Sequence, residues 1–170
     1  MTKPLRAALA GVFLAMSVAC ADNNSATAPS GLTSASSNGT PFNVSVRPSP
    51  ITATRCNPQC AGESGSGSFA FSATMTIAVE DAGAVGATVN TVTLTATAEG
   101  VTFAPLTFSS DDIRGQAGTT HIDGHATLSI PLTIVYNTPS GNPNLGVSLS
   151  LQITDDRTNQ VTATGQVNVI

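Results

Sequence analysis

Both histidines of the chain lie in one short segment that could bind a metal ion. Residues 120–125 read Thr-His-Ile-Asp-Gly-His. If this segment were extended, His121, Asp123 and His125 would share one face, which is a metal-ligand arrangement. Asp123-Gly124, however, is a turn signal, and a turn would break that face. We therefore expect two solvent-exposed loop histidines here rather than a metal triad.

Two of the three cysteines, Cys56 and Cys60, are separated by the turn-forming spacer Asn-Pro-Gln. In an extended strand their Cα atoms would lie about 13 Å apart, too far for a disulfide, whereas a turn brings the two sulfurs together. A zinc site needs more ligands than two cysteines, and thioredoxin-like chemistry favours a two-residue spacer on a helix. Because the N-terminal sequence predicts export to an oxidising compartment, we predict a structural disulfide.

The remaining candidates for catalysis do not form a set. Gly62, Gly65 and Gly67 resemble a glycine-rich loop, but the sequence around them has no βαβ pattern, so they predict a flexible connection between strands. The sequence contains no Gly-x-Ser-x-Gly elbow, and neither histidine is paired in sequence with an obvious nucleophile. A glycosidase needs two carboxylates in a cleft, and this chain has one Tyr and no Trp to stack sugars. We expect no enzymatic activity and no cofactor.

The first twenty residues are typical of an export signal. Lys3 and Arg6 precede an apolar stretch over residues 7–18, which is shorter than the roughly 20 residues that span a bilayer. The stretch ends in Ser-Val-Ala-Cys at residues 17–20. This ending resembles the lipobox of bacterial lipoproteins, although that family prefers Leu at the position of Ser17. The alternative is an ordinary secretory signal cleaved near Ala19 or Ala21, with Cys20 incidental.

The lipobox resemblance implies cleavage before Cys20, a diacylglyceryl thioether on its sulfur, and a fatty acid such as palmitate on the new amino terminus. Several acyl chains give stable anchoring where one would be marginal. Ala21 stands where Asp would resemble an inner-membrane retention signal, so the outer membrane is the favoured location. Without residues 1–19, four arginines face ten carboxylates, a net charge of −6. Such a surface repels phosphate backbones, which excludes nucleic-acid binding.

The rest of the chain divides into a tether and one folded domain. Residues 20–41 are mostly Ala, Ser, Thr, Asn, Gly and Pro, which predicts a lipidated flexible tether. Residues 42–170 alternate apolar and polar side chains in successive short runs separated by turn residues, which predicts strands. The runs cover residues 42–46, 69–79, 92–98, 101–108 (interrupted at Pro105), 128–136, 147–153 and 161–169.

Seven such strands at this spacing fit an all-β, two-sheet Greek-key sandwich. The domain resembles the immunoglobulin-like and fibronectin type III-like modules of bacterial envelope proteins. The resemblance rests on strand count, alternation and the turn-rich segment at residues 155–159 before the last strand. The chain lacks the Cys-Trp-Cys core of antibody domains, and a jelly roll or a small barrel is the alternative.

In an immunoglobulin-like topology, three acidic connections would meet at one pole of the sandwich. They carry Glu80 with Asp81, Asp111 with Asp112 and Asp123, and Asp155 with Asp156. Carboxylates gathered in this way could bind calcium weakly, as in other extracellular modules. The alternative is that loops are simply where a protein with few charges places them.

The leading functional hypothesis is therefore a non-catalytic, envelope-anchored adhesion, scaffolding or protein-interaction module, with a protein or a surface polymer as its partner. A second hypothesis is a receptor that binds a ligand or calcium at the acidic pole. A third is an inhibitor or accessory subunit that acts on another envelope protein through a sheet edge.

Overall fold

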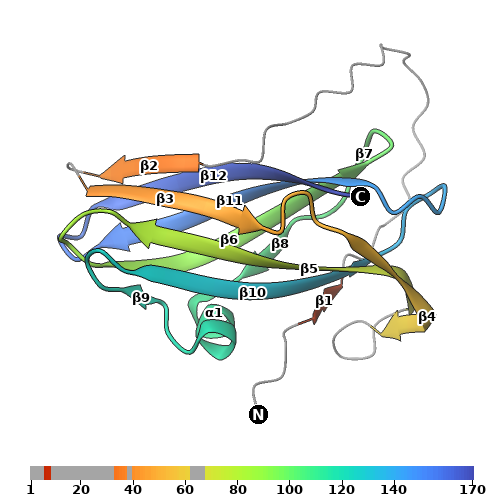
Figure 1. Ribbon diagram of the computed structural model, residues 1–170, viewed down its shortest axis with the longest axis horizontal. Coiled ribbons are helices and arrows are strands. Elements are labelled where there is room, and N and C mark those ends of the chain that lie inside the picture. Colours follow the sequence, from red (N-terminus) through yellow and green to blue (C-terminus); the bar gives the residue numbers. More distant parts are fainter. Residues whose placement is uncertain (1–5, 9–32, 38–39, 62–67) are drawn as a thin grey trace.

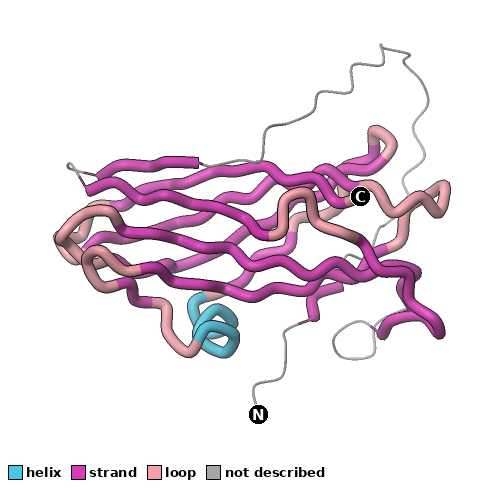
Figure 2. Tube along the Cα trace, viewed as in Figure 1, coloured by secondary structure: helices cyan, strands magenta, loops and turns pink. Residues whose placement is uncertain are grey.

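The computed structural model describes residues 6–8, 33–37, 40–61 and 68–170 (Figure 1). Strands dominate these residues, and one short helix accompanies them (Figure 2). The prediction of an all-β fold is confirmed. In chain order the elements are β1 (Arg6–Ala8), β2 (Thr33–Ser37), β3 (Thr40–Arg47), β4 (Ala53–Ala61), β5 (Ser68–Asp81), β6 (Ala87–Ala98), β7 (Val101–Thr102), β8 (Leu106–Phe108), α1 (Ser110–Ala117), β9 (His121–Ile122), β10 (Thr127–Tyr136), β11 (Leu145–Asp155) and β12 (Gln160–Val169).

The first sheet is built around β5. Within the described residues its strands follow the order β1, β10, β5, β3, β2, and β4 also pairs with β5. β10 is antiparallel to β5 along its whole length. From Phe69 to Val79, every second residue of β5 is buried, as the sequence alternation predicts for a strand with one face on a core.

The edge of this sheet next to β5 is divided between two strands. β3 pairs with the C-terminal part of β5, and β4 pairs with its N-terminal part. Between them the chain passes Pro48 and Pro50, which have no N–H to give to a ladder. Ile51 there pairs in parallel with Val169 of β12, and the Ile51 N–H donates to the Asn168 carbonyl at 2.9 Å. This bridge joins the two sheets along one side.

The second sheet has the order β12, β11, β6, and β7, β8 and β9 each pair with the outer edge of β6. β6 contains a bulge, because Gln152 lies opposite Thr91 whereas Ile153 lies opposite Val89, leaving Asn90 as the extra residue. The Asn90 Nδ2 donates to the Thr154 Oγ1 at 2.7 Å. The predicted interruption of the 101–108 strand is confirmed, since β7 and β8 are separate.

The two sheets pack as a sandwich over one hydrophobic core to which both contribute. The largest fully buried side chains include Phe42, Met75, Ile77, Leu94, Ile130 and Leu151. Burying a side chain of this size contributes about 1.5–3 kcal/mol each, so the alternating strands supply most of the stability.

Helix α1 was not expected from the sequence, which predicts a loop around Asp111 and Asp112. Ser109 caps the helix: its hydroxyl accepts from the Asp112 N–H at 3.3 Å, and the Asp112 carboxylate accepts from the Ser109 N–H at 2.8 Å. Gly118 ends the helix in the left-handed conformation that glycine tolerates best. α1 contacts β10, β6 and β8, and its one buried residue, Ile113, enters the core.

The N-terminal part of the chain differs from the predicted boundaries. β2 and the start of β3 pair antiparallel, so strand structure is present before Phe42, inside the segment predicted as a tether. β1 lies inside the predicted signal peptide and pairs in parallel with β10. Cys20 and the predicted apolar stretch from residue 9 onward lie outside the described residues.

Candidate functional site

Three connections interlock at the left end of the molecule in Figure 1, and we call them the loop pole. They are residues 82–86 after β5, residues 123–126 before β10 and residues 156–159 after β11. The His125 N–H donates to the Gly83 carbonyl at 2.8 Å, and the Asp156 N–H donates to the Gly86 carbonyl at 2.9 Å. A Cβ on Gly86 would lie only 2.8 Å from the Ile122 carbonyl oxygen, so the backbones approach too closely for a side chain. The loop pole is therefore tightly packed.

Two of the predicted calcium ligands, Asp81 and Asp155, are buried carboxylates that shape these connections. Asp155 accepts from the Arg157 N–H at 3.0 Å, from the Asn159 N–H at 2.7 Å and from the Asn159 side-chain amide. Asp81 accepts from the Gly83 N–H at 2.8 Å through Oδ1, while its Oδ2 is buried and has no hydrogen-bond partner among the described residues. Both side chains therefore act on the backbone of their own turns.

The exposed residues of the loop pole are arranged around His121. Its Nε2 lies 3.4 Å from the Asp123 Oδ1, and its Nδ1 lies 3.8 Å from the Asp156 Oδ1. Asp123-Gly124 forms the predicted turn, closed by a hydrogen bond from the Ala126 N–H to the Asp123 carbonyl. The predicted turn is therefore present, and His121 stays beside Asp123 at its start.

The other predicted calcium ligands are engaged elsewhere. Asp111 pairs with Arg114 at 2.9 Å on α1, and Asp112 caps the same helix. Hydrogen bonds from the Ser109 hydroxyl and backbone hold the pKa of Asp112 below its usual value. Glu80 is exposed on β5 between Asn43 and Thr127. Among the described residues, no three His, Cys, Asp or Glu side chains form a group that could hold a metal ion.

The prediction that these six acids form one calcium site therefore finds no support in the described residues. The physical reason is local. The helix cap holds Asp112, and an ion pair with Arg114 holds Asp111. Asp81 and Asp155 accept hydrogen bonds from their own turns, so four of the six carboxylates have local partners.

The predicted disulfide between Cys56 and Cys60 is confirmed, with Cα atoms 5.3 Å apart. It closes a loop in β4: Arg55 lies opposite Phe71 and Cys60 opposite Phe69, so residues 56–59 of β4 span the same stretch as the single residue Ala70 of β5. Residues 57–59 are exposed. The disulfide thereby keeps both ends of the loop in register with β5.

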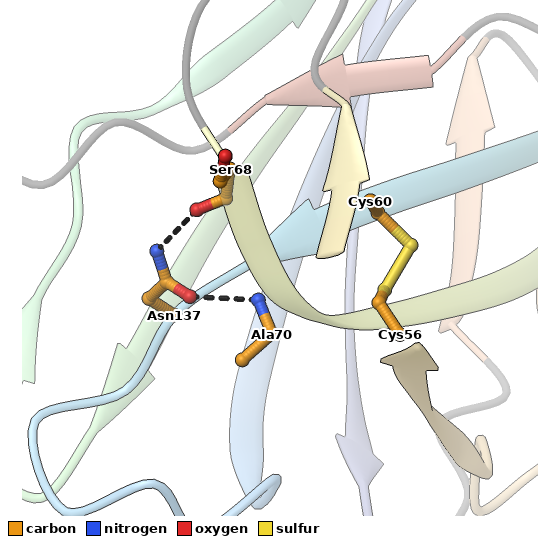
Figure 3. The surroundings of a disulfide bond; sticks show 5 residues. All are labelled: Cys56, Cys60, Ser68, Ala70 and Asn137. Atoms are coloured by element: carbon orange, nitrogen blue, oxygen red, sulfur yellow. Dashed lines mark hydrogen bonds between the residues drawn. A yellow bond between two sulfur atoms is a disulfide. The ribbon is translucent and has the colours of Figure 1, made fainter. Parts of the chain in front are cut away.

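Sequence reasoning missed the role of Asn137 near this disulfide. Figure 3 shows its side chain against the start of β5, where Oδ1 accepts from the Ala70 N–H at 2.8 Å and Nδ2 donates to the Ser68 carbonyl at 3.1 Å. Asn137 follows the last residue of β10, and its side-chain amide bonds the Ala70 N–H and the Ser68 carbonyl of β5 in the way that a neighbouring strand would. Arg55 lies over the Phe71 ring, 5.2 Å from its centre, at the same end of the sandwich.

Tyr136 is the second residue whose role was not predicted. Its ring is fully buried and stacks on Phe71 with centroids 5.6 Å apart. Its hydroxyl donates to the Pro143 carbonyl at 2.6 Å, which ties the connection after β10 to the core. Burial raises the pKa of Tyr136 to about 12.

Comparison with known proteins gives a fold and no function. No family model matches the chain, and no curated protein matches it. A solved structure, the X-ray structure of Northeast Structural Genomics Consortium target SoR45, matches 75% of this chain and 85% of its own chain, with a TM-score of 0.55 and 14% identity. No helix among the described residues is long and apolar enough to cross a membrane. At this identity the likeness to SoR45 extends to the fold alone.

Proposed function

We propose that this chain is a non-catalytic lipoprotein of the bacterial cell envelope whose folded part is an immunoglobulin-like interaction module. The strand order supports the immunoglobulin-like assignment. β3 with β4, β5 and β10 lie in one sheet and β6, β11 and β12 in the other, with the β5–β6 and β10–β11 connections passing between sheets. The parallel bridge from Ile51 to Val169 of the last strand is compatible with such a two-sheet sandwich.

The observation that carries the interaction role is the outer face of the second sheet. Its outward residues are Thr, Ser, Gln, Asn and Gly, and none of those on β6, β11 and β12 is charged. They form rows across the strands, such as Thr107, Thr93, Ser150 and Thr164. Adjacent strands lie about 4.8 Å apart and alternate residues about 6.7 Å, so the hydroxyls are closely and regularly spaced.

Such a face suits binding rather than catalysis. Each hydroxyl can both donate and accept a hydrogen bond. Because the face has no charged side chains, covering it with a partner does not require the desolvation of ions. A tether and lipid anchor at Cys20 would hold this face near the membrane, where an adhesion, scaffolding or accessory partner would meet it.

The test is site-specific photo-crosslinking in cells that produce the full chain. A photoreactive residue in place of Ser150, on the second sheet, should crosslink to a defined partner. The same residue in place of Thr76, on the outer face of the first sheet, should not. Equal crosslinking from both positions would contradict the role of the neutral face. The anchor is tested separately: Cys20→Ala should move the protein from the detergent phase to the soluble fraction, and full retention in the membrane would contradict lipidation.

A further inference from the structure

The outer edge of β10 accepts a strand from a distant part of the chain. β1 pairs with it in parallel, with Arg6 opposite Thr133, Ala7 opposite Ile134 and Ala8 opposite Val135. Every other strand-to-strand pairing in the described residues is antiparallel, apart from the isolated bridge at Ile51. In Figure 1, β1 lies beside the C-terminal end of β10, at the border of the first sheet. β1 is thus an addition to the edge of an otherwise complete antiparallel sheet.

Val135, near the C-terminal end of β10, is a buried apolar residue on the outward side of this edge strand. The inward residues of β10 are Leu128, Ile130, Leu132 and Ile134, so Val135 falls on the outward side of the strand. It is nevertheless only 1% exposed, and it is not part of the hydrophobic core between the sheets. An apolar outward residue at a strand edge is costly to leave uncovered, because both its side chain and the unpaired backbone groups beside it would face water.

The length of the usable edge is limited at its other end. Pro131 has no N–H to donate to a neighbouring strand, and α1 contacts β10. The stretch from Thr133 to Val135 is where β1 pairs, and β1 itself is three residues long. The edge therefore suits a short extended segment with small side chains, since the residues opposite Ile134 and Val135 are both alanines.

We infer that in the mature protein this edge is a docking site for a parallel β-strand of a partner protein, formed by a segment with small residues opposite Ile134 and Val135. The inference rests on the proposed function, because removal of residues 1–19 takes β1 away and vacates the edge. Main-chain hydrogen bonds would supply the affinity of such strand addition, and the alternating side chains its specificity. The precursor carries its own occupant, so the edge opens only when the leader is cleaved.

The test uses the full chain with Ala7→Pro and Ala8→Pro. Alternate N–H groups of a strand face the same neighbour, so removing two consecutive N–H groups removes a donor to β10 whichever of the two faces it. The probe is a fluorescent peptide with the sequence of residues 4–10, followed by fluorescence anisotropy. The double variant should bind the peptide saturably, and the wild-type full chain should bind it at least about tenfold more weakly because β1 competes. Hydrogen exchange should show the peptide protecting amides in residues 133–136.

A third substitution decides between this edge and nonspecific binding. Val135→Asp added to the double variant should weaken peptide binding by about tenfold or more, whereas Val101→Asp, at an exposed valine of β7, should leave it unchanged. Binding by the double variant no tighter than by wild type, or retained after Val135→Asp, would overturn the inference. If the double variant does not fold, protein isolated from the envelope and beginning at Cys20 presents the same vacant edge. Its mass separately reports whether residues 1–19 are removed, so failure of anchoring and failure of docking are distinguished.

Discussion

Asp155 and Asp156 are adjacent in sequence but should differ sharply in what they contribute to stability. The Asp155 carboxylate is 2% exposed and accepts hydrogen bonds from two backbone N–H groups and one side-chain amide. Each hydrogen bond to a charged group contributes about 1.5–3 kcal/mol. The donors belong to Arg157, which is exposed, and Asn159, which is partly exposed, so water replaces part of this loss. We expect Asp155→Ala to lower the free energy of unfolding by about 2–3 kcal/mol.

Asp156 provides the matched control. Its side chain is 52% exposed, and its contact with His121 is 3.8 Å long. Exposed ion pairs of this kind contribute little, so Asp156→Ala should change the free energy of unfolding by less than about 0.5 kcal/mol. The measurement is urea unfolding at neutral pH, with and without millimolar calcium against a sodium salt of equal ionic strength.

Equal costs for the two substitutions would refute the reasoning that burial and turn hydrogen bonds set the role of Asp155. A calcium-specific rise in the melting temperature that both substitutions abolish would restore the metal-site hypothesis that the described residues do not support. If Asp155 serves the turn alone, calcium and sodium should have equal effects on the wild-type protein.

Three further predictions concern other parts of the fold. Replacing Cys56 and Cys60 with Ser should lower the free energy of unfolding by about 2 kcal/mol in the chain-entropy model without abolishing the β-type circular dichroism spectrum, and complete unfolding would contradict the dominance of the core. Ile113→Ala should cost about 2–4 kcal/mol in urea unfolding, since α1 has no other buried residue, and a cost near zero would mean that the helix does not close the sandwich. Tyr136 is the only tyrosine and the chain has no Trp, so phenolate absorbance reports it alone. Its pKa of about 12 lies above the ordinary 10, so stability should be constant below pH 10 and fall as the pH rises towards 12, and an absorbance midpoint near 10 in the folded protein would contradict its burial.

The strands could be predicted because their alternation continues through long runs, as in β5 and β11. The predicted strand is too short where the alternation of inward and outward residues shifts by one position, as it does within β6. The bulge at Asn90 puts Val89 and Val92 on the same side, so regular alternation starts only at Val92 and the predicted strand lacks the first five residues of β6. The bulge arises from the pairing of β6 with β11, and the alternation of residues within β6 alone does not indicate it.

Helix α1 could not be inferred from periodicity because it has eight residues, a central Gly115 and one buried apolar side chain. Its sequence signal was the cap. Ser109 and Asp112 have the spacing of a capping box, and Gly118 follows at the position where helices end. Reading Asp111 and Asp112 as free loop carboxylates overlooked this signal. The consequence was two calcium ligands assigned to residues that a helix already uses.

The positions of Asp81 and Asp155 were predictable in a way that separates structural from ligand-binding acids. The inward series of β5 runs from Phe69 through Val79 in steps of two, and its next member is Asp81. The inward series of β11 reaches Ile153, and its next member is Asp155. Each aspartate therefore enters the core side at the end of a central strand, where the turn that follows donates hydrogen bonds to its carboxylate, to both oxygens of Asp155 and to Oδ1 of Asp81.

Their neighbours Glu80 and Asp156 fall on the opposite phase and are exposed. Two adjacent acids at a strand end thus divide into one that builds the turn and one that faces solvent. At Asp155 both carboxylate oxygens accept hydrogen bonds from the turn, whereas at Asp81 only Oδ1 does, and the outward acids Glu80 and Asp156 stand on separate connections. The alternation that places core residues also turns one acid of each pair inward, which is why the proposed function was assigned to the neutral outer face of the second sheet and the β10 edge and not to the acidic turns.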